Sequence, residues 1–442
     1  MNEKEINTNN YYIKYSDDKY NKDLYCENVT DNPNFVCKNL LVIELYRLKL
    51  YNKLKKKLIK LIKEYCDINK LKYDNKQSNE NKFSININFF IDIYSIIIIK
   101  MENKKDVLFN DISPFKKSNI EEYLINNKCI NIDKIHTDLT IKLLPKMDEH
   151  YIRYYKRLLR LRKKLFSIKY KINYEIIDQI VLLSLELDNE YIERLKFKEI
   201  KYRKKIKIPL HVFNHLIKLF NNRVMNDYIS TEILDDIVIE YIYMIYIRYM
   251  IISNGNNQAS IMPSFKKLLK EKLNIKVELF GSPINTSMTT FGSLFYDIEW
   301  VFGSIGNYFN TKIIKGYYEI NPPFDLCLIN NVLNKSLNEL NEANNNKNSL
   351  LFLLIIPLSY FKIKNFPNEL NKYVTFDKIL SKEEFPYIRY DRKFKNTKVS
   401  AIVDTRIIIC NTSYISSYVN TNITDFSKLL KLWITKKTIK NN

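Results

Sequence analysis

Glycine is confined to one window of this 442-residue chain. All six glycines lie between residues 255 and 316, at Gly255, Gly281, Gly292, Gly303, Gly306 and Gly316. A chain needs glycine where its backbone takes a positive φ or comes close to a ligand. The window itself is therefore expected to hold tight turns. Those turns are either ordinary connections in an α/β region or part of a ligand-binding site.

An Asn-Pro-Pro-Phe tetrapeptide, residues 321–324, follows soon after the window. The side-chain carbonyl of Asn321 and the backbone carbonyl of Pro322 are two acceptors for the two hydrogens of one exocyclic amine. Pro322 and Pro323 have a fixed φ, so the turn keeps its shape without a ligand. Phe324 offers a face on which a flipped base can stack. The motif predicts a site that methylates the amino group of adenine.

Basic residues outnumber acidic ones by a wide margin. The chain has 71 Lys and Arg against 49 Asp and Glu, which gives a formal net charge of +22 at pH 7. This surplus indicates a polyanionic partner or a strongly cationic surface. Asn, Lys, Ile and Tyr are frequent throughout, which is typical of an AT-rich genome and weakens the argument from lysine alone.

Cysteine and histidine suggest neither a metal site nor a disulfide framework. The six cysteines are scattered without CxxC spacing, and among the four histidines only His211 and His215 have helical i, i+4 spacing. We therefore expect no metal. The N-terminus is polar and the apolar run at residues 96–99 is too short for a bilayer, so we expect an intracellular chain without a signal peptide or membrane span.

Hydrophobic periodicity divides the chain into four regions. We predict a partly ordered polar arm at 1–35, a helical and basic RNA-binding domain at 36–252, a Rossmann-like domain at 253–425 and a basic tail at 426–442. The predicted helices before residue 253 cover 40–68, 149–168, 175–185, 191–201, 210–221 and 232–252.

Strands and helices are predicted to alternate after residue 253. Helices are expected at 263–273, 286–295 and 328–340, followed by a low-complexity loop at 341–348, and strands at 276–280 and 316–320. The fully apolar run at 350–357 is typical of a strand covered on both faces. Such alternation, with a ligand turn after the first strand, predicts a Rossmann-like α/β sheet.

Several motifs occur here in the order of a known family. They are Phe-Gly-Ser-Pro-Ile-Asn at 280–285, Phe-Tyr-Asp at 295–297 with Val-Phe-Gly-Ser at 301–304, Gly-Tyr-Tyr-Glu-Ile-Asn-Pro-Pro-Phe at 316–324, and the apolar strand that ends in Ile-Pro at 357. The stretch from Val277 to Tyr360 resembles the cap-specific adenosine methyltransferases, the family of the phosphorylated-CTD-interacting factor. The resemblance implies a helical domain packed on a methyltransferase domain, an S-adenosylmethionine cofactor, and N6-methylation of 2′-O-methyladenosine beside the cap of mRNA in the nucleus.

Three departures from the family pattern leave alternatives open. Leu326 stands where the family has an acidic residue that contacts the capped RNA, with Asp325 next to it. The family's Ile-Pro-Glu-Trp reads Ile-Pro-Leu-Ser at 356–359, with Tyr360 one place late. The only tryptophans are Trp300 and Trp433, so we expect no WW module and no recruitment to polymerase through it. The alternatives are an adenine-N6 methyltransferase on internal RNA or DNA, an inactive RNA-binding homologue, and cytoplasmic action if the source is a cytoplasmic virus.

The candidate cofactor contacts surround the glycine window. Backbone amides of the turn at 280–285 suit the methionine or adenosyl part, and Asp297 or Glu299 suits ribose hydroxyls. Glu319 shares a strand face with Asn321. Asp297 and Glu299 are alternatively solvated surface acids, and Glu319 is alternatively a satisfied buried acid. The full set is Phe280, Gly281, Ser282, Pro283, Asn285, Asp297, Glu299, Gly303, Ser304 and Glu319.

The candidate RNA contacts are mostly basic. Arg47 is the only arginine before Arg153, in a lysine-rich region, which indicates bidentate contact with phosphate or guanine. An ordinary surface position on a helix is the alternative. The full set is Arg47, Arg153, Arg157, Asp325, Tyr360, Arg389 and Arg392.

Overall fold

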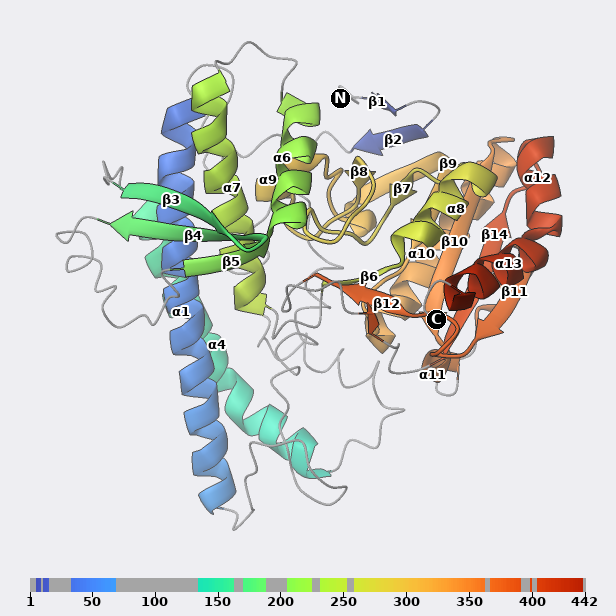
Figure 1. Cartoon of the computed structure of the whole chain (residues 1–442). Helices are drawn as coiled ribbons and strands as arrows, with labels where there is room; N and C mark the ends of the chain where they lie inside the picture. The colour runs from blue at the N-terminus through green and yellow to red at the C-terminus, as the bar shows by residue number, and fades with distance from the viewer. Residues whose placement is uncertain are drawn as a thin grey trace.

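The chain folds into a helical part beside a larger sheet that has helices on both faces (Figure 1). The computed structural model describes residues 5–8, 11–15, 33–68, 134–162, 170–187, 205–224, 231–252, 258–361, 366–390, 398–399 and 404–439. The helix predicted at 191–201, the apolar run at 96–99 and the candidate Arg392 lie outside these residues.

Three long helices form the centre of the helical part. Helix α1 (Pro33–Ile68) packs against α4 (Lys134–Arg162) and α7 (Thr231–Ile252), and α6 (Leu210–Val224) packs beside α7. Their apolar faces share one hydrophobic core, in which Leu45, Leu216 and Ile242 are almost fully buried. The helices predicted at 210–221 and 232–252 are close to α6 and α7, whereas α1 and α4 begin well before the predicted residues 40 and 149.

A small antiparallel sheet stands where a helix was predicted at 175–185. Strands β3 (Tyr170–Ile177) and β4 (Ile180–Leu187) form a hairpin, and β5 (Lys205–Pro209) pairs with β4. Buried residues alternate along β4, which is the period of a strand. Asp178 and Gln179 take positive φ in a two-residue connection, as the tight turn of a hairpin requires. The helical prediction was wrong because an apolar run without a clear period does not separate helix from strand.

The larger sheet is mixed. Strands β8, β7, β9 and β10 are mutually parallel neighbours in that order, and β14 is antiparallel to both β10 and β11. Strand β2 pairs with the first half of β9, and β1 pairs with β2. The strands are β1 (Glu5–Thr8), β2 (Tyr11–Tyr15), β7 (Val277–Glu278), β8 (Thr290–Phe291), β9 (Thr311–Ile320), β10 (Leu350–Pro357), β11 (Val374–Leu380) and β14 (Thr405–Asn411). This mixed α/β sheet is compatible with the predicted Rossmann-like fold.

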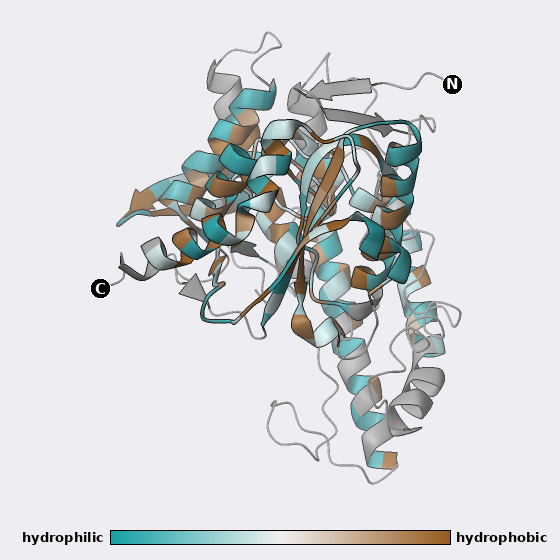
Figure 2. Ribbon diagram, turned by 90° about the vertical axis from the view of Figure 1, so that its right-hand side faces the viewer, coloured by the Kyte–Doolittle hydropathy of each residue, from teal (hydrophilic) through white to brown (hydrophobic). Residues whose placement is uncertain are grey.

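Strand β10 is the centre of this sheet, and every one of its residues is buried. Phe352 and Leu354 belong to the core under α10 (Leu326–Asn345), whereas Leu353 and Ile355 belong to the core under α8 (Pro263–Leu273) and α12 (Ser417–Thr424). Figure 2 shows the hydrophobic strands between helices that carry hydrophilic residues. The prediction of a strand covered on both faces is confirmed.

The C-terminal segment is part of the same core. Residues 426–439 form helix α13 (Phe426–Ile439) instead of the predicted tail. Phe426, Leu430 and Trp433 are buried, and the Trp433 ring lies 4.9 Å from that of Phe265 on α8. The lysines that suggested a tail alternate with an apolar face that covers the sheet.

Two predicted elements in the α/β part differ from the structure. The stretch 286–295 holds turns and the short strand β8, not a helix, and α9 (Tyr296–Glu299) begins only afterwards. Gly292 and the nearby Thr289 and Thr290 have low helix propensity and disfavour a helix there. Helix α10 continues to Asn345, through most of the asparagine-rich segment predicted as a loop.

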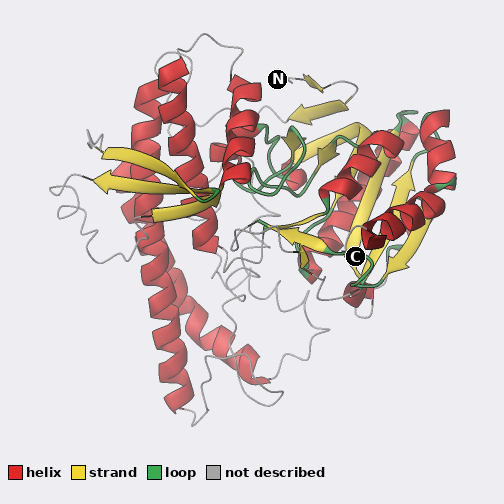
Figure 3. Cartoon of the chain, viewed as in Figure 1, coloured by secondary structure: helices red, strands yellow, loops and turns green. Residues whose placement is uncertain are grey.

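The segment between β7 and β9 joins the two parts of the chain. In Figure 3 its loops lie beside α6 and α7. Phe302 packs its ring 5.9 Å from that of Phe220 on α6, and Phe295 packs 5.2 Å from Tyr249 on α7. The core of the helical part therefore continues past the boundary predicted at residue 253.

No helix among the described residues is long and apolar enough to cross a membrane.

Candidate active site

The connections of the parallel strands reverse direction between β7 and β9. From β7 the chain first adds β8 on one side, and then returns to add β9 and β10 on the other side. In open α/β sheets, ligands bind outside the carboxyl ends of the strands at such a switch point. The Gly-Ser-Pro turn at 281–283 follows β7, and the tetrapeptide at 321–324 follows β9. The register pairs Glu278 with Glu319, so the two turns leave neighbouring strand ends on the same edge.

The corner at 321–324 is held between β9 and α10. Asn321 is half-buried and Pro322 is buried, while Pro323 and Phe324 are exposed. The backbone N–H of Asp325 donates to the Pro323 carbonyl at 2.8 Å. The Asp325 carboxylate accepts from the N–H of Leu328 at 2.7 Å and so caps α10. Asp325, predicted to contact RNA, has this capping role in the structure.

The Phe324 ring stands at the open side of the corner. Phe324 is 46% exposed. Tyr387, in β12 (Tyr387–Arg389), meets Phe324 edge to face at 6.1 Å and supports it from one side. The exposed part of the ring offers a surface for stacking.

The turn after β7 is closed by its own hydrogen bonds. The Ser282 hydroxyl donates to Gln258 Oε1 at 2.6 Å, and its backbone N–H donates to Asn285 Oδ1 at 2.9 Å. The N–H of Gly281 donates to the carbonyl of Gly292 at 2.8 Å. Phe280 packs its ring 5.7 Å from Tyr308 behind the turn. Phe280, Gly281, Ser282, Pro283 and Asn285, the candidate cofactor contacts of this turn, lie at the end of β7.

Two carboxyl groups are buried side by side behind both turns. Glu278 and Glu319 are 3% and 2% exposed, and Lys266 of α8 donates to Glu278 Oε2 at 2.5 Å. Neither Glu278 Oε1 nor Glu319 Oε1 has a hydrogen-bond partner among the described residues. Burial and the neighbouring Glu278 raise the pKa of Glu319 to about 8, although Lys266 opposes the shift. Glu319 is therefore mostly protonated at neutral pH.

Lys266, Glu278 and Gln258 were not among the predicted site residues. A lysine on a helix and a glutamate in a short strand carry no motif of their own. The register of β7 with β9 is what brings Glu278 beside Glu319, and that register was not predictable from spacing alone.

Asp297 and Glu299 do not face the strand ends as free carboxylates. Asp297 accepts two hydrogen bonds from Arg248 of α7, at 2.9 and 3.0 Å. Glu299 accepts from the Tyr249 hydroxyl at 2.6 Å and from the backbone N–H of Phe295 at 2.8 Å. Burial raises the pKa of Glu299 to about 7. Both acids, predicted to bind ribose, instead tie the β7–β9 segment to α7.

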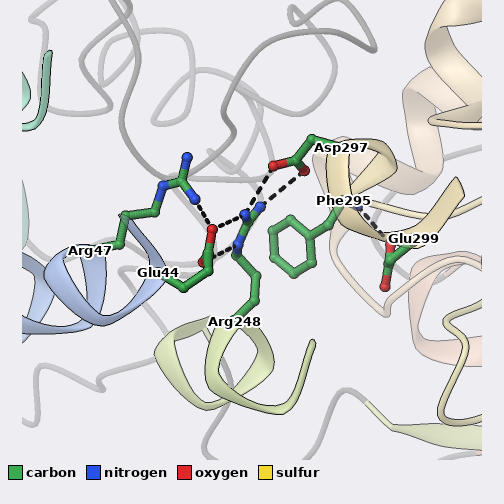
Figure 4. A network of polar contacts seen from close by, with 6 residues as sticks. All are labelled: Glu44, Arg47, Arg248, Phe295, Asp297 and Glu299. Carbon is green, nitrogen blue, oxygen red and sulfur yellow. Dashed lines mark hydrogen bonds and ion pairs between the residues drawn. The ribbon is translucent and has the colours of Figure 1, made fainter. Parts of the chain in front are cut away.

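Arg248 is the centre of a buried network (Figure 4). Its guanidinium, 0% exposed, pairs with Glu44 of α1 and with Asp297, and lies 5.0 Å from the centre of the Phe295 ring. Glu44 also accepts from Arg47, which is 2% exposed. Arg47 is thus a buried partner of a carboxylate, and both its predicted RNA contact and the surface alternative are wrong. Its fork geometry serves an acid of the same chain.

The remaining candidates are dispersed. Arg153 and Arg157 are exposed on α4. Tyr360 is fully buried, and its hydroxyl donates to Asn330 Oδ1 at 3.4 Å, so it does not present a stacking face. Arg389 lies in β12. The Ser304 hydroxyl lies 2.5 Å from that of Ser293 and accepts from the N–H of Gly306 at 3.0 Å, which shapes the loop before β9.

A Gly303→Ala substitution is expected to destabilise the protein by about 1–3 kcal/mol. Gly303 has φ of +99°, and an added Cβ would lie 2.2 Å from the carbonyl oxygen of Thr289. Denaturant unfolding measures the loss. Ser287→Ala, at an exposed position in the same segment, is the control and should change stability by less than about 0.5 kcal/mol. Equal stability of the two variants would contradict the argument from strain.

Comparison with known proteins gives one family. The family model described as the phosphorylated CTD interacting factor 1 WW domain matches residues 215–388. Over these residues the chain is similar to the phosphorylated CTD interacting factor 1 family. The matched range runs from α6 to β12 and contains both turns of the candidate site, the buried carboxyl pair and Arg248. No curated protein matches the chain.

Among the described residues, no group of three or more His, Cys, Asp or Glu side chains is arranged to hold a metal ion.

Proposed function

We propose that this chain is an S-adenosylmethionine-dependent RNA methyltransferase that methylates N6 of the adenosine beside the mRNA cap, acting in the nucleus. The observation that carries the proposal is the position of the two turns. A rigid Asn-Pro-Pro-Phe corner and a Gly-Ser-Pro turn leave adjacent parallel strands at the switch point of a Rossmann-like sheet. The relationship to phosphorylated CTD interacting factor 1 supports the same activity.

The corner supplies what methylation of an aromatic amine requires. The lone pair of the adenine amine is delocalised into the ring, so the nitrogen is a poor nucleophile. Hydrogen bonds from the amine to Asn321 Oδ1 and the Pro322 carbonyl would draw it out of conjugation and aim its lone pair. Phe324 would hold the base by stacking. Catalysis is then mainly positioning and electrostatics, without a strong base, because the amine proton becomes acidic once the nitrogen is alkylated.

The residues behind the turns fit the proposed cofactor. The Gln258 amide nitrogen, Glu278 Oε1 and Glu319 Oε1 are buried polar atoms without partners among the described residues. Native proteins rarely leave such groups unsatisfied, so a polar ligand is expected beside them. When bound, S-adenosylmethionine supplies an electrophilic methyl group on a sulfonium. Gln258, Ser282 and the carboxyl pair would hold its amino-acid end.

RNA binding is assigned to the exposed basic face of α4. Arg153, Arg157 and Arg160 are exposed at i, i+4 and i+7 on this helix. Phosphate contacts need charge and little geometric precision, so such a stripe suffices for the RNA backbone.

A second candidate is adenine-N6 methylation of internal RNA or DNA. It is favoured by Leu326 and Ser359, which stand where the family pattern has an acidic residue and a tryptophan. The transfer site at 321–324 is the same for both candidates.

Methyl transfer from labelled S-adenosylmethionine to different substrates distinguishes the two candidate functions. The chain is incubated with capped RNA that starts with 2′-O-methyladenosine, the same RNA without a cap, and single-stranded DNA of the same sequence. Transfer to the capped RNA alone supports the proposal, and equal transfer to all three supports the second candidate. No transfer to any, together with no binding of S-adenosylmethionine in calorimetry, would overturn both.

A further inference from the structure

The buried pair Glu278 and Glu319 has an unusual charge balance. One lysine, Lys266, serves two carboxyl groups, and it donates to Glu278 only. Burying a second carboxylate without a partner is costly, so Glu319 stays neutral while no other cation is present. A cation that entered beside the pair would remove this penalty and allow Glu319 to ionise.

The two unpartnered carboxyl oxygens belong to residues at the neighbouring ends of β7 and β9. An ideal Cβ at Gly281 would lie 3.1 Å from Glu278 Oε1, so the missing side chain leaves room beside this carboxyl group. The neighbouring residue, Ser282, is held by Gln258, whose own amide nitrogen is buried without a partner among the described residues. Among the described residues, two unpartnered carboxyl oxygens thus lie on the paired ends of β7 and β9, and one unpartnered amide donor belongs to the glutamine bonded to the turn after β7. An α-amino acid end, with an ammonium and a carboxylate, has the matching groups.

We propose that Glu278 and Glu319 receive the ammonium of the donor's amino-acid end, that the Gln258 amide faces its carboxylate, and that Glu319 releases its proton to solvent as the ammonium binds. This inference rests on the proposed cofactor. No covalent bond forms or breaks except the O–H bond of Glu319, and the cation that binds replaces the charge of the proton that leaves. Cofactor affinity then rises with pH.

Charged and titratable groups from several elements lie around Glu319 and Glu278. Glu278 of β7 and Lys266 of α8 lie next to it, and Tyr387 of β12 interacts with its charge. Burial raises the pKa of Tyr387 and raises that of Tyr390, near Glu278, to about 12. His215 of α6 faces Lys266 and Glu278, and burial lowers its pKa, so it is mostly neutral above its ordinary titration range.

The raised pKa of Glu319 determines how cofactor affinity changes with pH. Below about pH 8 the free protein carries a protonated Glu319, and the bound form carries a carboxylate. Binding therefore releases about one proton, and affinity increases about tenfold per pH unit while the bound form stays ionised. The useful window is about pH 6 to 7.5, below the titration of the ligand's α-amino group.

Calorimetry of the full chain in buffers of low and high ionisation enthalpy, phosphate and Tris, measures proton release directly. S-Adenosylmethionine and S-adenosylhomocysteine share the amino-acid end and should both release about one proton. 5′-Methylthioadenosine lacks that end and should release none. A Glu319→Gln variant should bind S-adenosylmethionine without proton release and without the pH slope. Glu271→Gln, at an exposed position of α8, is the matched control and should behave as the parent chain.

Proton release on binding and methyltransferase activity are contradicted by different results. Binding of S-adenosylmethionine with the same heat in both buffers and the same affinity across the window would overturn the proton release and leave the methyltransferase proposal standing. Failure of all three ligands to bind would overturn the methyltransferase proposal itself. The parent chain alone decides between these results, so the test holds even if Glu319→Gln does not fold.

Discussion

An Asn321→Ala variant is expected to transfer methyl groups about 10²–10³-fold more slowly than the parent chain, as when one aimed polar group is removed from an active site. Asn321 directly follows β9, and its half-buried residue lies on a corner fixed by Pro322, Pro323 and the cap of α10. Alanine removes one of the two acceptors that hold the target amine. The rate with labelled S-adenosylmethionine and capped RNA measures the effect.

Two further variants test whether the loss arises at the amine. Asn321→Asp retains an acceptor oxygen at the same distance from the backbone and should keep more activity than the alanine variant. Asn368→Ala, at an exposed position before β11, should have the parent rate. Cofactor and RNA affinities should stay within about threefold in all three, because the lost contact orients the amine and does not anchor either ligand. A parent-like rate for Asn321→Ala would refute the role of the corner.

An Arg248→Met variant is expected to lose about 3–5 kcal/mol of folding free energy, the usual result of removing one partner from a buried ion pair. The substitution leaves Glu44 without its cationic partner on α7 and removes the two hydrogen bonds to Asp297. It also removes the cation that lies over the Phe295 ring. Because these contacts join α1, α7 and α9, the loss should appear as unfolding at lower denaturant concentration.

Arg157→Met is the matched control, since this arginine is exposed on α4. Its expected change is within about 0.5 kcal/mol. Adding Glu44→Gln to Arg248→Met should recover part of the loss, because the uncompensated buried carboxylate is then removed. If Arg248→Met is no less stable than Arg157→Met, the network does not hold the helical part on the β7–β9 segment.

Local patterns predicted the regular elements best. The apolar run at 350–357 and the amphipathic stretch at 263–273 became β10 and α8 with the predicted bounds. The hairpin of β3 and β4 was mistaken for a helix, because its apolar residues have no helical period and its turn contains neither glycine nor proline. The C-terminal helix was mistaken for a tail, because its lysines hide an apolar face that only the sheet explains.

In the candidate site, too, contiguous motifs were readable from the sequence, whereas contacts between distant residues were not. The residues at 280–285 and 321–324 were predicted from motifs, since each motif is contiguous and each follows a strand. Arg47, Asp297 and Tyr360 were assigned to ligands from their residue type, and the structure gives them partners within the chain or buries them. A side chain that suits a ligand also suits an oppositely charged neighbour, and sequence spacing does not distinguish the two.

The sequence alone determined where the turns lie and what chemistry they offer, because glycine, proline and asparagine act on the backbone within a few residues of themselves. The tertiary structure decided which charges meet. Glu278, Glu319 and Lys266 come from β7, β9 and α8, and Glu44, Arg248 and Asp297 from α1, α7 and α9. Strand register and helix packing over long separations set those contacts, and neither has a local signature.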